Sequence, residues 1–454
     1  MVPQRVDFMN GLRGIAVLMV LLYHAFVSGI LPLSLDLPGL SLDFPLPVLD
    51  GGLTGVEIFF FISGFVLFYP YAQHIFEGRP LQTLTHYAER RMAKIVPSYV
   101  LVLIVMTIVC PRNIEQPDSL AVHFVKHLFF LHGFWEASLT SIIGPLWTLA
   151  VEVEFYLLFP FIARCFMRAP LCTMGTMIAI SVGYRVFLSI AKLDYTFFWT
   201  NQLPDFFDIF GFGCLAAYSL VRSRNLHASG CGTLTKWTAT SCFGVLIFYG
   251  LLGSLIRVPG GAPTWHWLND SRDIIGLTLY LTCVGITRGS ALIRDILGNP
   301  ILLWFSDISY NLYLWHMNVF YLYLNHISHW IAPLPYGISL NAVFGLALPV
   351  GIAWCVTHWV EKPILRKGLL GILRIPTKWP LTRLASFEFG MGSRRLPCRG
   401  RTGQAGERSS FRKRPWLGCA LVIVFVLGAQ ALSRATRISD ERAREPSMPP
   451  STME

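Results

Sequence analysis

The sequence predicts an all-α polytopic membrane protein, a bundle of about ten transmembrane helices with an eleventh near the C-terminus. Of its 454 residues, 54% are hydrophobic and only 14% are charged. A soluble domain carries roughly 25% charged residues, so the deficit favours lipid as the main solvent. Apolar stretches long enough to cross the hydrocarbon core, about 20 residues each, recur along the chain.

The apolar runs give the expected spans in order. They lie near residues 13–31, 53–72, 95–111, 146–167, 171–191, 203–221, 236–256, 272–288, 301–329 and 338–360, and the eleventh near 415–433. The link between the first two spans carries three Asp residues and no Lys or Arg, whereas the next link carries Arg79, Arg90, Arg91 and Lys94. Cytoplasmic loops are enriched in Lys and Arg, so the N-terminus is expected in the cytoplasm and the loop 112–145 outside.

Composition divides the chain into four parts. Residues 1–363 form the expected membrane-embedded domain, and 364–414 form a basic, Gly- and Pro-containing cytoplasmic linker. The run 415–433 is the extra helix, and 434–454 a short polar tail.

Two classes of ligand are not expected. The net charge of +11 is spread over short links, not gathered in one continuous basic face, so nucleic acid is not an expected partner. The ten cysteines include no Cys-x-x-Cys pair, and His123, His127 and His132 have no carboxylate beside them. We therefore expect no metal and no bound cofactor, and interpret these histidines as solvated groups at the membrane interface.

Arg13 and His24 are ionisable residues inside the first span, where charge is costly and usually functional. They are eleven residues apart, about three helical turns, so they share a face and lie about 16 Å apart along the axis. We expect Arg13 near the cytoplasmic end, suited to holding phosphate, and His24 near the bilayer middle, suited to act as a general base. The alternative is a snorkelling Arg13 and a His24 bonded to a neighbouring helix.

Five segments, in order, carry a family resemblance. They are GLRGIAVLMVLLYHA (11–25), GVEIFFFISGF (55–65), RRMAKIVPSY (90–99), LWTLAVEVEFYLLFP (146–160), and ISYNLYLWH (308–316) followed by VEKP (360–363). Together they resemble the acyltransferase family 3 membrane proteins. The match departs from the family's Arg-x-x-Arg motif, since Arg91 is followed by Lys94. Some relatives also continue into an external hydrolase-like domain, for which the sequence after the eleventh run leaves no room.

The resemblance implies a membrane-bound O-acyltransferase of the bacterial cytoplasmic membrane. Its donor would be acyl-CoA, often acetyl-CoA, used as a co-substrate from the cytoplasmic side. Its acceptor would be a hydroxyl of a carbohydrate or glycolipid, as in polysaccharide O-acetylation. Arg13 and His24 match the residues regarded as essential in the family.

Further residues are expected to bind donor or acceptor. Glu57 either pairs with Arg13 or orients His24, or it forms a structural ion pair within the membrane. Glu152 has the same alternatives and holds the second acidic position of the resemblance. Arg91 and Lys94 guide the CoA phosphates or only set the orientation of the loop. Three more residues share one face of a helix and line the acceptor site or form a helix contact: Ser309, Tyr313 and His316. Glu361 and Lys362 are expected to be structural.

Rival functions remain open. A multi-span transporter of a small solute or glycoconjugate also suits buried charges, although no two corresponding halves are visible. A His-x-x-x-x-Asp acyltransferase site is disfavoured because no histidine is followed by Asp at that spacing. A third alternative is a chain that only presents substrate to a partner. The acyl length, the acceptor, the oxyanion donor, the oligomeric state and the choice between direct transfer and a covalent intermediate stay undetermined.

Overall fold

The computed structural model describes residues 7–44, 49–109, 119–193, 196–225, 231–254, 264–288 and 291–367. The eleventh span, the polar tail and most of the expected linker lie outside these residues. The first four linker residues, 364–367, belong to a short helix, α16 (Lys362–Lys367). All-α architecture is confirmed, because the described chain is helical apart from one small hairpin and its connections.

Ten long helices coincide with the ten expected spans within the described residues. They are α1 (Asp7–Val27), α3 (Gly55–Glu77), α4 (Leu84–Val109), α7 (Trp147–Arg168), α8 (Pro170–Ala191), α9 (Phe207–Asn225), α10 (Cys231–Ser254), α11 (Thr264–Arg288), α13 (Pro300–His326) and α15 (Gly337–Val356). Shorter elements connect them: η1 (Gly51–Thr54), α5 (Leu120–Leu128), η2 (Leu131–Phe134), α6 (Glu136–Leu139), η3 (Gly144–Leu146), η4 (Trp199–Asn201), η5 (Leu203–Phe206), α12 (Ala291–Leu297), α14 (Ser328–Ile331) and a π-helical turn, η8 (Thr357–Glu361).

Seven helices of the described chain are both long and apolar enough to cross a membrane. They include α1, α3, α4, α7, α8, α9 and α15. The protein is therefore an integral membrane protein with several spans, and the total of ten remains a prediction. Helix α11 falls short of that standard because Asp270, Arg272 and Asp273 lie in its first half.

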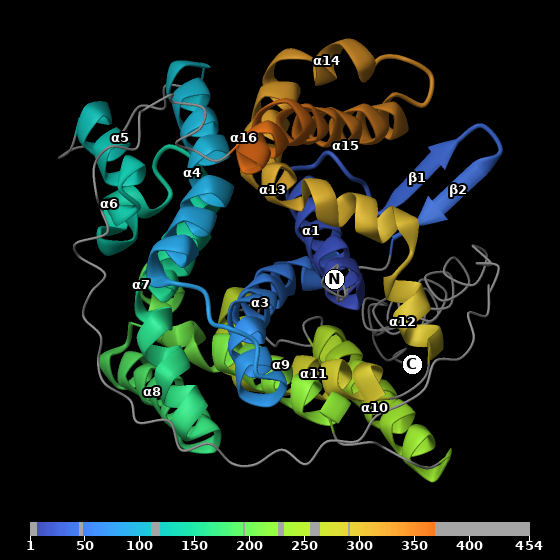
Figure 1. The fold of residues 1–454 in the computed structure, drawn as a ribbon. Helices are drawn as coiled ribbons and strands as arrows, with labels where there is room; N and C mark the ends of the chain where they lie inside the picture. Colours follow the sequence, from blue (N-terminus) through green and yellow to red (C-terminus); the bar gives the residue numbers. More distant parts are fainter. Residues whose placement is uncertain are drawn as a thin grey trace, which may run out of the picture.

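Close helix pairs build the bundle (Figure 1). The most extensive contacts join α3 to α9, α1 to α13 and α10 to α11. Glycine permits the first contact: a Cβ at Gly64 would lie 2.1 Å from the carbonyl oxygen of Phe210, and one at Gly213 equally close to that of Phe61. Small residues of this kind let the backbones of membrane helices approach each other.

The bundle has two ends, which we name by their residues. At the basic end α1 begins, α3 and α7 end, and Arg13, Arg91, Arg164 and Arg168 gather. At the opposite, histidine end, α1 finishes in the turn that carries His24.

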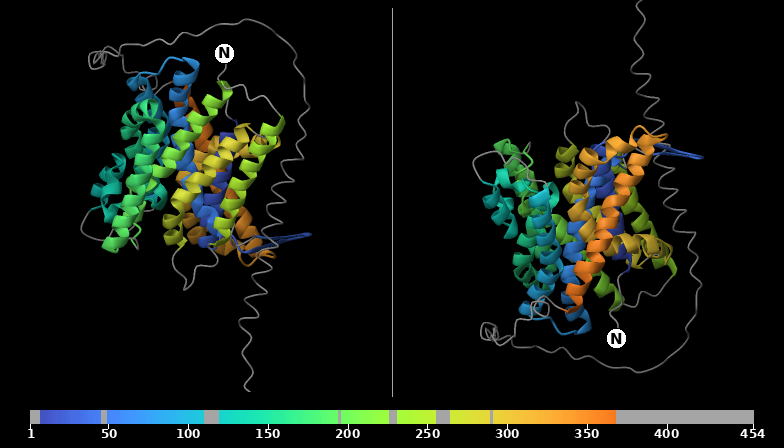
Figure 2. Two further views of the ribbon diagram at one scale, coloured as in Figure 1. Left: turned by 90° about the horizontal axis from the view of Figure 1, so that it is seen from below. Right: turned by 90° about the horizontal axis from the view of Figure 1, so that it is seen from above.

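A two-stranded antiparallel hairpin, β1 (Ser34–Leu37) and β2 (Leu40–Asp43), interrupts the acidic first loop. Figure 2 shows it projecting at the end opposite the link from α3 to α4. Its turn uses Gly39 at φ +74°, and its strand is tied to α15, since Ser339 Oγ accepts from the Asp36 amide at 2.9 Å. The sequence did not predict these strands.

Residues 119–146, in the expected external loop, fold back on the bundle. Tyr99 of α4 stacks on Phe130 with ring centroids 4.3 Å apart and donates to the His127 carbonyl at 2.8 Å. This packing buries His123, His127 and His132 completely. Their interpretation as solvated interfacial histidines was therefore wrong, because the short helices cover them against α4 and α7.

Candidate functional site

Helix α1 carries the two expected site residues, at different ends of the bundle. The helix begins six residues earlier than expected and ends at Val27, so His24 lies in its last turn. The expectation that His24 sits near the middle of the span was therefore wrong. The eleven-residue spacing holds, which places Arg13 and His24 on one face about 16 Å apart along the axis.

His24 meets His316, which projects from α13. The Nε2 atom of His316 lies 3.2 Å from Nδ1 of His24, and the ring centroids are 4.9 Å apart. Glycine allows α1 to lie this close to α13: a Cβ at Gly14 would be 2.2 Å from the Leu302 carbonyl oxygen. Gly11 permits an even closer approach to Leu297, at the end of α12. Parallel packing of α1 and α13 thus brings the two histidines together.

Hydrogen bonds to carbonyls define the tautomer of each neutral ring. His316 Nδ1 lies 2.8 Å from the carbonyl oxygen of Tyr313, so Nδ1 carries the proton and Nε2 is an acceptor. His24 Nδ1 lies 3.0 Å from the Val20 carbonyl oxygen and faces that acceptor nitrogen of His316. His24 Nδ1 therefore donates, and its Nε2 keeps the lone pair that a general base needs.

Tyr313 and Ser309 extend from the same face of α13 as His316, as expected. The Tyr313 hydroxyl accepts from Thr148 Oγ1 at 2.9 Å and lies 3.3 Å from the Pro145 carbonyl oxygen. Ser309 Oγ donates to the Ser306 carbonyl at 2.9 Å, within its own helix. Tyr313 thus lies beside the histidine pair, with its ring centroid 5.8 Å from that of His316, whereas the Ser309 hydroxyl is used locally.

A second centre, the basic cluster, surrounds Arg13 at the other end. It consists of Arg13 from α1, Arg91 and Lys94 from α4, Glu152 from α7 and Glu361 from η8. Lys94 forms an ion pair with Glu361, whose other oxygen accepts from Asn311 Nδ2 at 2.7 Å. The π-helical turn places Glu361 inward here, and such turns recur at functional sites.

Glu152 is held by hydroxyl groups, not by a guanidinium. Its Oε1 accepts from Ser63 at 2.5 Å and from Tyr156. In the described part of the chain, Arg13 forms no hydrogen bond or ion pair, and the buried Nε of Arg91 has no partner. Arg91 instead lies over the rings of Tyr87 and Tyr156, 5.9 and 5.4 Å from their centroids. Two guanidiniums with unused donors make this cluster suitable for an anion.

Glu57 belongs to a third centre. It neither pairs with Arg13 nor orients His24, and its contact with Arg272 is the alternative, an ion pair within the bundle. Its Oε1 lies 3.3 Å from Nε of Arg272, a buried residue of α11. Arg272 also donates to Asp205 at 2.6 Å, and Arg185 bridges Asp205 and Asp208 at 2.7 and 2.8 Å. Because α3 and α11 pack together, Glu57 is turned toward this network and away from Arg13.

Several of these residues were missed by sequence reasoning. Arg185 and Arg272 are charged residues within apolar helices, a signal that had been applied to Arg13 but not to them. Thr148, Tyr156 and Asn311 gave no such signal, since hydroxyl and amide side chains are common in membrane helices.

The histidine cluster of residues 119–146 differs from a metal site. The rings of His127 and His132 stack with centroids 3.9 Å apart, and their outer nitrogens bond to Ser141 and the Leu146 carbonyl. Burial lowers the pKa of His132 to about 4 and that of His127 well below its usual value. Among the described residues, no group of three or more His, Cys, Asp or Glu side chains has metal-binding geometry.

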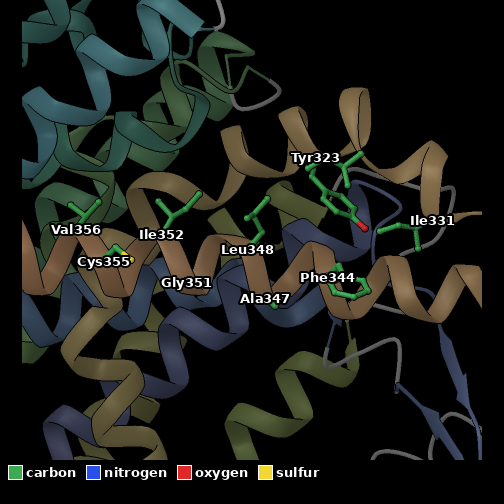
Figure 3. Close-up of a pocket in the computed structure, with 10 residues that line it drawn as sticks. Tyr323, Ile331, Phe344, Ala347, Leu348, Gly351, Ile352, Cys355 and Val356 are labelled. Atoms are coloured by element: carbon green, nitrogen blue, oxygen red, sulfur yellow. The ribbon is translucent and has the colours of Figure 1, made fainter.

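A surface groove lies on the flank of α13 and α15, with a volume of about 570 Å³ (Figure 3). Its walls are mostly apolar and include Ile331, Phe344 and Val356. The Tyr323 hydroxyl, which also lines the groove, donates a hydrogen bond to Asn341 Oδ1 at 2.7 Å. Apart from the Cys355 thiol and the Tyr323 hydroxyl, its lining is apolar, and neither His24 nor His316 lines it, so the groove is distinct from the histidine pair.

The family model described as an acyltransferase domain, that of acyltransferase family 3, matches residues 6–360. The chain belongs to this family. Among curated relatives, the O-acetyltransferase OatA of Staphylococcus aureus strain NCTC 8325 is 22% identical over 397 residues. That alignment covers 83% of this chain and 60% of the relative, and OatA of strains COL and MRSA252 gives the same values. The chain therefore spans about 60% of the length of these relatives. No solved structure matches.

Family membership gives the three centres their context. The family match runs through Arg13, His24, Glu152 and His316, and it ends one residue before Glu361. The histidine pair and the basic cluster are therefore the candidate active site.

Proposed function

We propose that the protein transfers an acyl group, acetyl in the simplest case, from acyl-CoA to a hydroxyl of a carbohydrate or glycolipid. One observation carries the proposal: a single face of α1 presents at one end a guanidinium with no partner among the described residues, and at the other an oriented imidazole. The name O-acetyltransferase, borne by OatA of Staphylococcus aureus, supports acetyl as the group and a hydroxyl as the acceptor.

The separation of the two centres favours an elongated donor. About 16 Å lies between the levels of Arg13 and His24 along α1. Acyl-CoA carries its phosphates and its thioester at opposite ends of a long pantetheine arm, so both centres act on one molecule. A compact donor such as acetyl phosphate reaches only one of them. Ser63, Tyr156 and Tyr313 provide polar groups along the interior between the two levels.

Arg13 and Arg91 hold the phosphates in this mechanism. Their unused N–H groups supply the hydrogen-bond donors. Lys94 either keeps its ion pair with Glu361 or leaves it to bind the incoming phosphate. Glu152 and Glu361 limit the net positive charge, so the site binds a polyanion without holding it irreversibly.

His24 acts as the general base. Its Nε2 takes the proton of the acceptor hydroxyl as that oxygen attacks the thioester carbonyl. The tetrahedral intermediate collapses with cleavage of the carbon–sulfur bond, and the proton passes from His24 to the departing thiolate, which gives CoA and the O-acyl product. His316 stabilises the imidazolium through the bond between its Nε2 and His24 Nδ1. We assign no oxyanion donor, since the Tyr313 hydroxyl and His316 Nδ1 are both engaged.

The test measures acyl transfer in membranes that contain wild type, His24→Ala or His326→Ala. His326 is an exposed histidine in the last turn of α13, at the same end of the bundle, and serves as the matched control. Mass spectrometry of extracted glycans and glycolipids reports the acyl mark, and free thiol reports CoA release from acetyl-CoA.

We expect the mark and CoA release with wild type and His326→Ala, and neither with an inserted His24→Ala. Retention of both by His24→Ala would overturn the assignment of the base. If no acyl mark depends on the protein, the proposed reaction is wrong, and uptake of labelled solute into vesicles would then test the transporter alternative.

A further inference from the structure

A pocket between the C-terminal turns of α3 and α7 lies at the basic end, outside the candidate active site. Its volume is about 380 Å³, and it is lined by His74 and Ile75 of α3 and by Arg164, Met167 and Arg168 of α7. No carboxylate lines it, and no contact described above uses its two arginines.

The two arginines are an unneutralised pair within the described residues. Arg164 and Arg168 are four residues apart and therefore neighbours on one helix face, where like charges repel. Arg164 makes one long bond, 3.4 Å, to the Pro160 carbonyl, and neither guanidinium takes part in an ion pair of the described chain. The nearest acid at the end of α3, Glu77, is bound to Arg79 at 2.8 Å and to Gln73 at 3.1 Å.

The same face of α7 is apolar further into the membrane. Leu157, Phe161, Arg164 and Arg168 follow the spacing of one helical stripe. Leu157 is 78% exposed and Phe161 69%, which leaves both open to hydrocarbon in a spanning helix. An apolar stripe that ends in two cations is complementary to an anionic phospholipid, whose acyl chain would lie along the apolar residues and whose phosphate would lie beside the arginines at the headgroup level.

The stripe faces away from the basic cluster. Glu152 and Tyr156 lie on the other side of α7, since each residue turns the helix by about 100° and the two faces differ by roughly 130°. Phe159, fully buried, contacts both Tyr87 and Tyr71 and so fills the space between the two arginine groups. A phosphate in this pocket is therefore not the phosphate of a donor bound at Arg13.

We propose that this pocket binds the phosphate headgroup of an anionic membrane phospholipid, with one acyl chain lying along Leu157 and Phe161. The phosphate lies between Arg164 and Arg168, offsets one of their two positive charges, and holds the end of α7 against α3. This site does not depend on the proposed acyl-transfer reaction.

The experiment compares the full chain in nanodiscs of phosphatidylcholine with and without phosphatidylglycerol. The test variant is Arg164→Gln/Arg168→Gln, and the control is Arg222→Gln/Arg294→Gln, which removes two exposed arginines from α9 and α12. Native mass spectrometry reports retained lipid, and thermal unfolding reports the stabilisation.

We expect a one-to-one phosphatidylglycerol adduct and a higher Tm for wild type and control, and loss of both in the test variant. Equal retention by all three proteins would overturn the site. Protection of wild type by CoA or inorganic phosphate in phosphatidylcholine alone, lost in the test variant, would assign the pocket to a soluble phosphate and also overturn the lipid. Should the double variant fail to fold, Arg168→Gln alone and the wild-type comparison of the two lipids decide the question by the same criteria.

Discussion

His316 Nε2 lies 3.2 Å from Nδ1 of His24, although 292 residues separate them in the sequence. A proton on His24 Nδ1 and a lone pair on His316 Nε2 satisfy this contact and both carbonyl contacts. The pair therefore has a direction: His316 accepts, His24 donates, and the opposite nitrogen of His24 is left basic. A residue that the sequence marked only as a possible acceptor contact becomes the positioning residue for the base.

The first prediction concerns His316. His316→Phe removes the acceptor for His24 Nδ1, and we expect kcat to fall by roughly 100-fold, within the range that general-base catalysis contributes. His316→Gln supplies an amide oxygen at a similar position and should recover a substantial part of that loss. The KM for acyl-CoA should stay unchanged in both, because the basic cluster lies at the other end of α1. The measurement is steady-state CoA release from acetyl-CoA.

A purely structural role for His316 would give another pattern. His316→Gln and His316→Phe would then lose activity in proportion to their thermal stability, with no advantage for the amide. That outcome, seen in properly inserted protein, would remove His316 from the proposed mechanism.

The second prediction concerns Arg13. Arg13→Gln removes a guanidinium that has no other partner in the described chain, and we expect kcat/KM for acetyl-CoA to fall by about 10- to 100-fold, the equivalent of a charged hydrogen bond of about 1.5–3 kcal/mol. Arg13→Lys keeps the charge without the planar fork and should lose less. Turnover is to be measured with acetyl-CoA and with S-acetylpantetheine, which lacks phosphate.

The phosphate-free donor provides the control. Wild type and Arg13→Gln should use S-acetylpantetheine equally poorly, since neither gains from a phosphate contact. If the substitution lowers the rate with both donors by the same factor, Arg13 does not act through phosphate.

The third prediction concerns Arg272. Arg272→Met leaves Glu57 and Asp205 buried with one partner fewer, and breaking a buried pair costs about 3–5 kcal/mol. We expect a clear fall in the Tm of the detergent-solubilised protein. Because Glu57→Gln removes one of the stranded charges, the double variant should be less destabilised than the sum of the two single variants. Additive losses would show that Glu57 and Arg272 are not coupled.

Hydropathy was sufficient to place the ten long helices, because each needs a continuous apolar stretch and little else. It could not give their ends within a few residues, so His24 moved from the middle of a span to its last turn. Nor could it give the hairpin at 34–43, whose pairing is held partly by Ser339, 303 residues away from Asp36.

The relative position of two site residues was predictable where both lie on the same helix. Arg13 and His24 lie on one face because of their spacing alone. The partner of Glu57 was not predictable, since Arg272 is 215 residues away and reaches it only through the packing of α3 with α11. Glu361 was similarly hidden: its inward direction follows from a π-helical turn, which no pattern of hydropathy reports.

The final prediction concerns pH and the buried histidines of residues 119–146. Burial lowers the pKa of His132 to about 4 in the folded protein, against about 6.5 for a solvated histidine. Between these values the unfolded chain binds a proton that the folded chain does not, so stability is fully present above pH 6.5 and falls as the pH drops toward 4. For His132 alone the loss at pH 5 is about 2 kcal/mol, and His127 adds to it in the same direction. Thermal unfolding in detergent at pH 7.5 and pH 5 measures the difference. The difference in Tm between pH 7.5 and pH 5 should be smaller in His132→Gln, because glutamine does not titrate. It should be as large as in wild type in His326→Gln, because the ring of His326 is already exposed in the folded protein. An unchanged pH difference in His132→Gln would mean that His132 is already protonated in the folded protein or that its cavity admits water.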